Sequence, residues 1–263
     1  MLIINADDWG RLRGETDAAL QCHQHGRITS VSAMVFMLDS ERAAELAKEN
    51  DLDVGLHLNF AEKFTGHSVP DRLEACQSKI SCFLMQNKYS QLVYNPFLRK
   101  EFFYSYQAQA EEFERLFGKP PSHIDGHHHM HLCANVLLSR MVPIGIGMRR
   151  NFSFWPGEKS ILNRAYRGSV DRWLARRYHL ADYFFDLTQS IGDKKLDRVA
   201  ALASSSNVEL MTHPVVPSEL AYLISDEFAT LLRGVEIGTY PRMGLPSDQP
   251  APPLFVEEHR FSN

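Results

Sequence analysis

Short apolar segments alternate along this chain with longer segments of helical periodicity. The apolar segments are four to seven residues long and are bounded by polar or turn-forming residues, which is the pattern of buried β-strands. Eight strands are predicted: Leu2–Asn5, Val31–Met37, Asp53–Leu58, Ser122–Asp125, Ile144–Met148, Tyr183–Asp186, Val208–Met211 and Val235–Thr239. Strands that alternate with helices are typical of an α/β fold with a parallel sheet, either open or closed into a (β/α) barrel.

Helical periodicity fills most of the intervals between these strands. Apolar residues recur at helical spacing from Tyr106 to Phe117, which predicts an amphipathic helix over residues 101–117. Other helices are predicted over residues 15–25, 41–49 and 193–203. The polar stretch at about 62–95 breaks the alternation, and a connection of this length is typical of a lid or binding loop. A second loop is predicted over Phe152–Gly157.

Length and composition fit one folded domain that spans residues 1–263. Hydrophobic residues make up 44% of the chain and charged residues 23%, so a substantial core can form. The net charge of −4 argues against nucleic acid as a partner, although residues 164–178 contain five arginines. A surface helix with Trp173 and Leu174 facing inward explains these arginines as solvated side chains.

The chain also lacks the sequence signals of a membrane or redox-active protein. No apolar stretch approaches ~20 residues, so no membrane span is expected. The apolar segment after Met1 is too short for a signal peptide. The four cysteines form no CxxC pair, which predicts reduced thiols and a cytoplasmic location.

Four of the twelve histidines lie within Asp125–His131, whose sequence is DGHHHMH. Turn chemistry does not require four imidazoles, whereas a carboxylate beside several imidazoles suits Zn²⁺ and other borderline divalent ions. An extended backbone would place Asp125, His127, His129 and His131 on one side, and a helical start would bring His127 and His131 together. Either geometry aligns at least two metal ligands.

Further polar groups lie where predicted strands meet loops. Asp7 and Asp8 follow the first strand, His57 is near the end of the third, and His213 follows Val208–Met211. Because the carboxyl ends of parallel strands meet at one edge of a sheet, these groups can converge with the histidine cluster. Adjacent aspartates face opposite sides of an extended strand, so a turn is expected to bring both into one pocket.

Each of these groups also has an ordinary structural explanation. An acidic pair such as Asp7 and Asp8 commonly caps a helix or turn, and a lone histidine in an apolar strand, such as His57, is usually a core residue. The histidine cluster can be a solvated surface turn. Their occurrence together favours a metal site with an open coordination position, where the pKa of a bound water falls toward ~7.

Five segments, in this order and spacing, resemble those of the YdjC-like family of carbohydrate deacetylases, which includes chitooligosaccharide and hopanoid-associated deacetylases. The segments are IINADDWG, ITSVSAMV, GLHLNF, HIDGHHHMH and ELMTHP. The resemblance covers about residues 1–60 and 111–140, and a shorter part at 207–217. It implies an irregular, TIM-barrel-like (β/α) barrel related to the polysaccharide deacetylases, often found as a homodimer.

The resemblance implies a role for each central residue of the site. Asp8, His57 and His127 would hold one divalent metal ion per chain, Zn²⁺ or Mg²⁺. Asp7 would be the general base, and His213 a candidate general acid. With three protein ligands, a coordination position remains for the water that attacks an acetamide carbonyl.

Supporting roles are expected for neighbouring residues. Asp125 would orient a ligand histidine, as carboxylates beside metal ligands often do. His129 and His131 would support the ligands or face the substrate, and the indole of Trp9 could stack on a sugar ring.

Arg11 and Arg13 depart from the family pattern, in which smaller, uncharged residues follow the two aspartates. A guanidinium beside the site would favour a carboxylate or phosphate on the substrate, through paired charge-assisted hydrogen bonds. The alternative is that both arginines are solvated surface residues, as most arginines are.

The resulting functional hypothesis is a metal-dependent hydrolase that removes the acetyl group from an N-acetylated sugar, such as an N-acetylglucosamine-type oligosaccharide or glycoconjugate. The partner would then be a small carbohydrate. A metal phosphoesterase is the alternative enzyme, because aspartate and histidine ligands also serve two-metal hydrolysis. A non-catalytic carbohydrate-binding protein that retains the metal site is the alternative outside enzymes.

Overall fold

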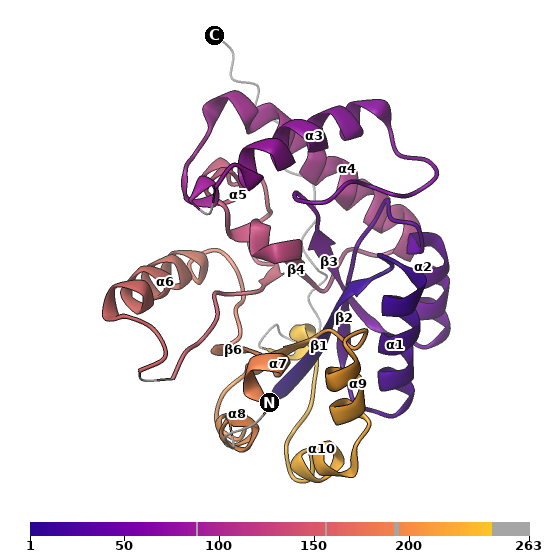
Figure 1. The fold of residues 1–263 in the computed structure, drawn as a ribbon, viewed down its shortest axis with the longest axis vertical. Helices are drawn as coiled ribbons and strands as arrows, with labels where there is room; N and C mark the ends of the chain where they lie inside the picture. The colour runs from indigo at the N-terminus through magenta and orange to yellow at the C-terminus, as the bar shows by residue number, and fades with distance from the viewer. Residues whose placement is uncertain (88, 156, 192–194, 244–263) are drawn as a thin grey trace.

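A curled sheet of seven parallel strands forms the centre of the molecule, with helices around it (Figure 1). The computed structural model describes residues 1–87, 89–155, 157–191 and 195–243. The strands are β1 (Leu2–Trp9), β2 (Ser30–Ala33), β3 (Asp53–Leu58), β4 (His123–Gly126), β5 (Gly147–Met148), β6 (Tyr183–Asp186) and β7 (Val208–Thr212). Their order across the sheet is β5-β4-β3-β2-β1-β7-β6, and all neighbours are parallel. The predicted (β/α) barrel-type fold is confirmed, in the form of a half-barrel.

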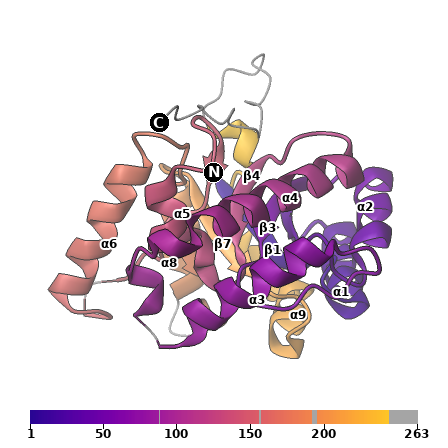
Figure 2. The same cartoon turned by 90° about the horizontal axis from the view of Figure 1, so that it is seen from above.

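Helices surround this sheet in both views of the molecule (Figures 1 and 2). They are α1 (Arg13–Gln24), α2 (Ser40–Glu49), α3 (Asp71–Met85), α4 (Arg99–Phe117), α5 (Ala134–Ser139), α6 (Ile161–Leu174), α7 (Leu187–Ser190), α8 (Lys195–Ala203), α9 (Pro217–Leu223) and α10 (Asp226–Leu231). Short 3₁₀ helices are η1 (Ser90–Leu92), η2 (Pro96–Leu98), η3 (His127–Leu132) and η4 (Tyr240–Arg242). None of the described helices is both long enough and apolar enough to cross a bilayer.

The core lies on both faces of the sheet. All eight residues of β1 are buried, because β2 and β7 flank this strand and side chains cover both of its faces. On the periphery, α4 buries Phe102, Tyr106 and Phe113, in agreement with its predicted amphipathic pattern. Burial of each such ring stabilises the fold by about 1.5–3 kcal/mol, which holds the strand ends in a fixed arrangement.

Two sequence predictions about the fold are wrong. Val235–Thr239 is not a strand: only Ile237 forms an isolated bridge, to Leu2. The reason is that β7 lies on one side of β1 and β2 takes the other side from Asn5 onwards, so only the first residues of β1 are left for a further strand to pair with. The stretch 62–95 is not a continuous loop, because it contains the fifteen-residue helix α3. That part of this stretch acts as a lid stays a prediction.

The other predicted elements differ mainly at their ends. β1 continues through the aspartates to Trp9, whereas β5 has only two residues. Helix α8 begins at Lys195, and residues 193 and 194 of its predicted first turn lie outside the described residues. The functional consequence is that the candidate site residues lie at the carboxyl ends of β1, β3, β4 and β7, as the parallel sheet predicts.

Candidate metal centre and active site

The carboxyl end of β1 carries two adjacent aspartates whose side chains are both buried. Asp7 and Asp8 are only 4% and 6% exposed. Between Ala6 and Trp9 the pairing with β2 shifts, and Asp8 adopts the left-handed backbone conformation, with a φ of 65°. Such an irregularity re-aims side chains at a strand end. A bulge within the strand, rather than the expected turn after it, therefore brings both carboxylates into the same polar region.

Asp8, His57 and His127, which were predicted to be metal ligands, lie together in the structure. Oδ1 of Asp8 lies 2.9 Å from Nδ1 of His127 and 3.3 Å from Nε2 of His57. One ligand atom from each residue lies within 4.8 Å of the other two, and all three residues are buried. One carboxylate and two imidazoles are a donor set that fits Zn²⁺ and similar ions. The predicted convergence of β1, β3 and the segment after β4 is therefore present.

The electrostatics of this cluster favour a cation. Burial raises the pKa of Asp8, but hydrogen bonds from His127 and His57 outweigh it, so the pKa is well below its usual range. Burial lowers the pKa of His57, yet the carboxylates of Asp125 and Asp7 raise it to about 10. Without a metal ion, the carboxylates thus stabilise an added proton on His57. A divalent cation supplies the same positive charge, so its binding would displace that proton.

Asp125 lies directly behind His57. The two residues are partners in the β3–β4 register, and Nδ1 of His57 lies 2.8 Å from Oδ1 of Asp125. The second oxygen of Asp125 accepts a hydrogen bond of 2.8 Å from the hydroxyl of Ser32. These contacts fix the imidazole ring with Nε2 towards Asp8. The predicted contact between Asp125 and a ligand histidine is therefore present.

Arg149 was not identified from the sequence, although it lies at the centre of the site. Its fully buried guanidinium donates hydrogen bonds of 2.7 Å to both oxygens of Asp7. It also contacts Oδ2 of Asp125 and Oε1 of Glu209, each at 2.7 Å. Burial raises the pKa of Asp7, but Arg149 outweighs it and keeps the carboxyl group ionised. Its position in the sequence could have indicated a place at the site, because Arg149 directly follows the predicted strand Ile144–Met148.

Glu209 continues this buried network away from the metal ligands. Burial raises its pKa to about 7, against the opposing effect of Arg149. The hydroxyl of Tyr240 donates a hydrogen bond to its second oxygen. The ring of Tyr240 stacks on His123, with centroids 4.0 Å apart. Arg149 is therefore held on the side opposite Asp7 as well.

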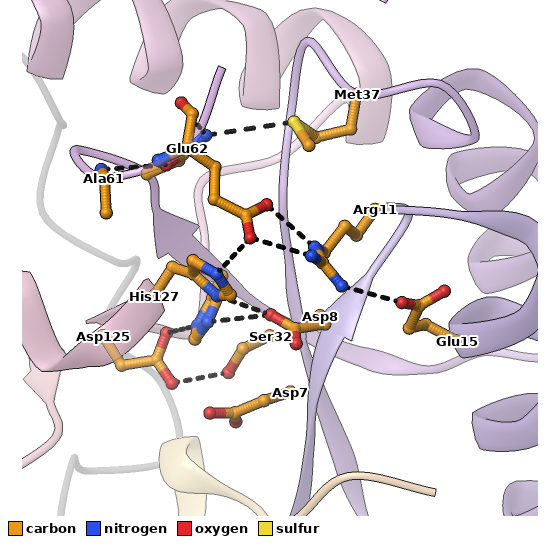
Figure 3. A network of polar contacts seen from close by, with 12 residues as sticks. Asp7, Asp8, Arg11, Glu15, Ser32, Met37, Ala61, Glu62, Asp125 and His127 are labelled. Atoms are coloured by element: carbon orange, nitrogen blue, oxygen red, sulfur yellow. Dashed lines mark hydrogen bonds and ion pairs between the residues drawn. The ribbon is translucent and has the colours of Figure 1, made fainter. Parts of the chain in front are cut away.

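Glu62 is the second residue that sequence reasoning missed. Its Oε1 lies 3.2 Å from Nε2 of His127, and its carboxylate accepts hydrogen bonds of 2.9 and 2.8 Å from Arg11 (Figure 3). Arg11 also contacts Glu15 at 3.0 Å. Arg11 thus lies beside the site. The side chain of Arg13 is 77% exposed, so it is a solvated surface residue.

The expectation that Trp9 stacks on a sugar is wrong. Trp9 is fully buried, and its indole N–H donates a 3.0 Å hydrogen bond to the carbonyl of Ala43. His131 is also fully buried, and its Nε2 lies 3.1 Å from the backbone carbonyl of Arg149, so it cannot face a substrate. His129 is partly buried, with its ring centroid 4.6 Å from that of Phe152. Of the two histidines, only His129 retains any exposed surface.

His213 lies at the same edge of the sheet as Asp7. Thr212, the last residue of β7, pairs with Ala6 of β1. The residues that follow these two in the chain, His213 and Asp7, therefore lie at the same carboxyl edge. Potential ligand atoms of Asp186 and Glu219 lie within 4.8 Å of a ring nitrogen of His213. Burial raises the pKa of Asp186, and the charges of both His213 and Asp7 act on it. His213 therefore lies on the side of Asp7 that faces β6.

The fold and this site together define the class of protein. It is a half-barrel α/β protein with carboxylates and histidines gathered at the carboxyl edge of a parallel sheet. The sequence model of the YdjC-like protein family matches residues 1–236, and the chain belongs to this family. The predicted family is thereby confirmed.

Individual relatives extend this comparison. A chitooligosaccharide deacetylase from Proteus mirabilis (strain HI4320) is 31% identical over 228 residues, which are 81% of each protein. One from Yersinia pestis is 31% identical over 139 residues, 52% of each protein. Among solved structures, a protein assigned to cellobiose-phosphate cleavage from Enterococcus faecalis V583 has a TM-score of 0.68 and 20% identity, over 93% of this chain and 98% of that one. The last comparison shows a shared fold.

Proposed function

We propose that this protein is a metal-dependent carbohydrate deacetylase that hydrolyses the acetamide of an N-acetylated sugar. The observation that carries the proposal is the pairing of two adjacent carboxylates with different surroundings. Asp8 contacts two imidazoles, whereas Asp7 contacts the guanidinium of Arg149. The two aspartates can therefore take different roles at the end of one strand, Asp8 as a metal ligand and Asp7 as a base. The names of the relatives in Proteus and Yersinia support the same reaction.

The residues around the metal site have complementary tasks in this reaction. One divalent ion held by Asp8, His57 and His127, either Zn²⁺ or Mg²⁺, would supply Lewis-acid activation of water and of the acetyl carbonyl. Asp7 accepts the proton of the water whose oxygen bonds to the carbonyl carbon. Arg149 keeps Asp7 ionised and fixes the direction of its carboxylate through two parallel hydrogen bonds.

His213 completes the proton transfers. As the carbon–nitrogen bond breaks, the departing amine nitrogen needs a proton, and His213 donates it. Oxygens of Asp186 and Glu219 lie within 4.8 Å of a ring nitrogen of His213, close enough to hold the ring in place. The products are acetate and the free amino sugar, and the two proton transfers leave Asp7 protonated and His213 neutral.

A neutral N-acetylglucosamine-type sugar is the substrate that these charges favour. Arg11 is already paired with Glu62 and Glu15, and Arg13 faces solvent. No free cation among the described site residues is therefore available for an anionic sugar. The cytoplasmic location and the homodimer stay predictions.

Acetate release from N-acetylglucosamine oligomers tests the proposal. The purified protein is treated with a chelator, assayed, and assayed again after addition of Zn²⁺ or Mg²⁺. Activity that disappears with the chelator and returns with one ion per chain is the expected result. Release of phosphate from sugar phosphates without acetate release would identify the phosphoesterase instead. Sugar binding without either reaction would identify a non-catalytic binding protein.

A further inference from the structure

Helix α6 stands at the edge of the molecule, on the side opposite α1 and α2, in both views (Figures 1 and 2). Of its fourteen residues, only Asp171 and Leu174 are buried. It contains most of the arginine-rich segment noted in the sequence, which the proposed reaction does not use. The helix therefore presents most of its surface outward.

The first turns of α6 expose large apolar side chains. Ile161 and Leu162 are each 83% exposed, and Tyr166 is 50% exposed. At 100° per residue, Ile161, Leu162, Ala165 and Tyr166 fall on one continuous face of the helix. Helices of soluble domains normally direct such residues towards the core, so a contiguous exposed set marks an interaction surface.

Basic side chains lie beside this apolar face: Arg164 in the first turns of α6, Arg172 near its end, and Arg176 two residues after the helix ends. Arg164, Arg172 and Arg176 are exposed, and among the described residues no carboxylate lies within 4.0 Å of their guanidinium groups. The one acidic residue of the helix, Asp171, is buried and paired with Arg150 at 2.8 Å. Among the described residues, the charged side chains exposed on α6 and in the turn after it are therefore all cationic, in a protein whose net charge is −4.

We propose that α6 binds the surface of a bilayer containing anionic phospholipids. An apolar helix end beside a row of arginines is the composition of helices that lie in the membrane interface. Ile161 and Leu162 would enter the acyl region, and the arginines would contact lipid phosphates. The loop from Phe152, whose ring packs on His129, leads into α6, so binding would bring the site close to the membrane.

Charge distinguishes this partner from the other candidates. A two-fold contact between two copies of the chain through α6 would place the same arginines against one another, which like-charge repulsion opposes. Nucleic acid would satisfy the arginines but would leave Ile161 and Leu162 in water. An anionic bilayer satisfies both sets of side chains.

Sedimentation with lipid vesicles tests the proposal. The full chain is mixed, without substrate, with vesicles of phosphatidylglycerol and phosphatidylcholine, and separately with vesicles of phosphatidylcholine alone. Binding to the mixed vesicles that weakens as salt is added is the expected result. The double variant Ile161→Ser, Leu162→Ser should weaken binding roughly tenfold or more, because each side chain loses its transfer into the apolar region. The triple variant Arg164→Glu, Arg172→Glu, Arg176→Glu should abolish it.

Matched controls come from the opposite side of the molecule. Leu38 is 54% exposed just before α2, and Arg13 is exposed on α1, so Leu38→Ser and Arg13→Glu should bind vesicles like the unmodified protein. Unchanged thermal melting of all variants confirms that they fold. Equal binding by the α6 variants overturns the proposal. So does an α6-dependent dimer, or α6-dependent binding to a DNA fragment, in the absence of vesicle binding. Acetate release is not measured, so failure of the proposed reaction leaves this test intact.

Discussion

Replacement of Arg149 by Met should destabilise the protein strongly. The side chain is fully buried and is the shared partner of Asp7, Asp125 and Glu209, each at 2.7 Å. Removal of one partner from a buried ion pair costs about 3–5 kcal/mol, because the other charge stays buried without compensation. Since domains are stable by about 5–15 kcal/mol, this is about a fifth or more of the total. In a chain of this size the midpoint of thermal unfolding should fall by roughly 6–20 °C.

The loss should also depend on pH in a defined direction. Burial already raises the pKa of Glu209 to about 7, and loss of Arg149 raises the pKa of Glu209, Asp7 and Asp125 further, because the guanidinium lowers all three. The folded variant then binds more protons than the unfolded chain, so its stability falls as pH rises. Urea unfolding of the chelator-treated variant and the unmodified protein at pH 5 and pH 8 measures this effect. The difference between the two proteins should be larger at pH 8.

A compensating substitution provides the control. Glu209→Gln in the Arg149→Met background removes one unpaired charge while keeping an oxygen for the hydroxyl of Tyr240, so part of the stability should return. A loss of stability below about 1 kcal/mol in Arg149→Met at pH 8 would refute the reasoning. A solvent-exposed salt bridge contributes no more than this to stability, so the ion pairs of Arg149 would then not behave as buried ones. A difference that grows as pH falls would refute the sign of the argument.

Three further predictions concern the reaction. Asp7→Asn should retain one metal ion per chain, measured by elemental analysis, while acetate release falls ~10²–10⁴-fold; loss of the metal as well would reverse the roles of the two aspartates. His127→Ala should lose metal and activity together, whereas the exposed neighbour His128→Ala should keep both, and equal metal content in the two variants would contradict the ligand assignment. Arg11→Ala should change the ratio of kcat/KM for a neutral and an anionic N-acetyl sugar by less than about twofold, like the control Arg13→Ala; a tenfold change would restore the anionic-substrate hypothesis.

The sequence contains enough to predict the sheet and the convergence of polar side chains at its carboxyl edge, because both depend on local signals; the choice of three of them as metal ligands comes from the family resemblance and stays a prediction. Strand ends in a parallel sheet share one edge, so Asp8, His57 and His127 could be brought together without knowledge of the strand order. The sequence also contains a periodic signal for α3, because Leu73 and Ile80 lie on one face of the helix. Polar and cysteine residues between them made this signal hard to recognise.

Contacts between distant segments could not be predicted in the same way. Arg149 lies 142 residues from Asp7 in the chain, and no spacing rule links them. Glu62 lies in an irregular segment after β3, where periodicity gives no side-chain direction. The position of Trp9 directly after the two aspartates wrongly suggested contact with a substrate. The bulge at Asp8 changes which residues of β1 face the core, and Trp9 is buried there. Local periodicity thus identifies which residues share an edge, but not which of them touch.

The guanidinium of Arg149 makes the two halves of the site interdependent. Its Nη1 bonds both Asp7 and Asp125, and Asp125 in turn orients the ring of His57. A change that alters the hold on His57, for instance to prefer another ion, therefore also alters the proton affinity and direction of Asp7. By reciprocity, the ion and the ionised state of the base strengthen or weaken one another by the same factor. In the proposed reaction, ion preference and proton transfer can therefore be re-engineered only as a pair.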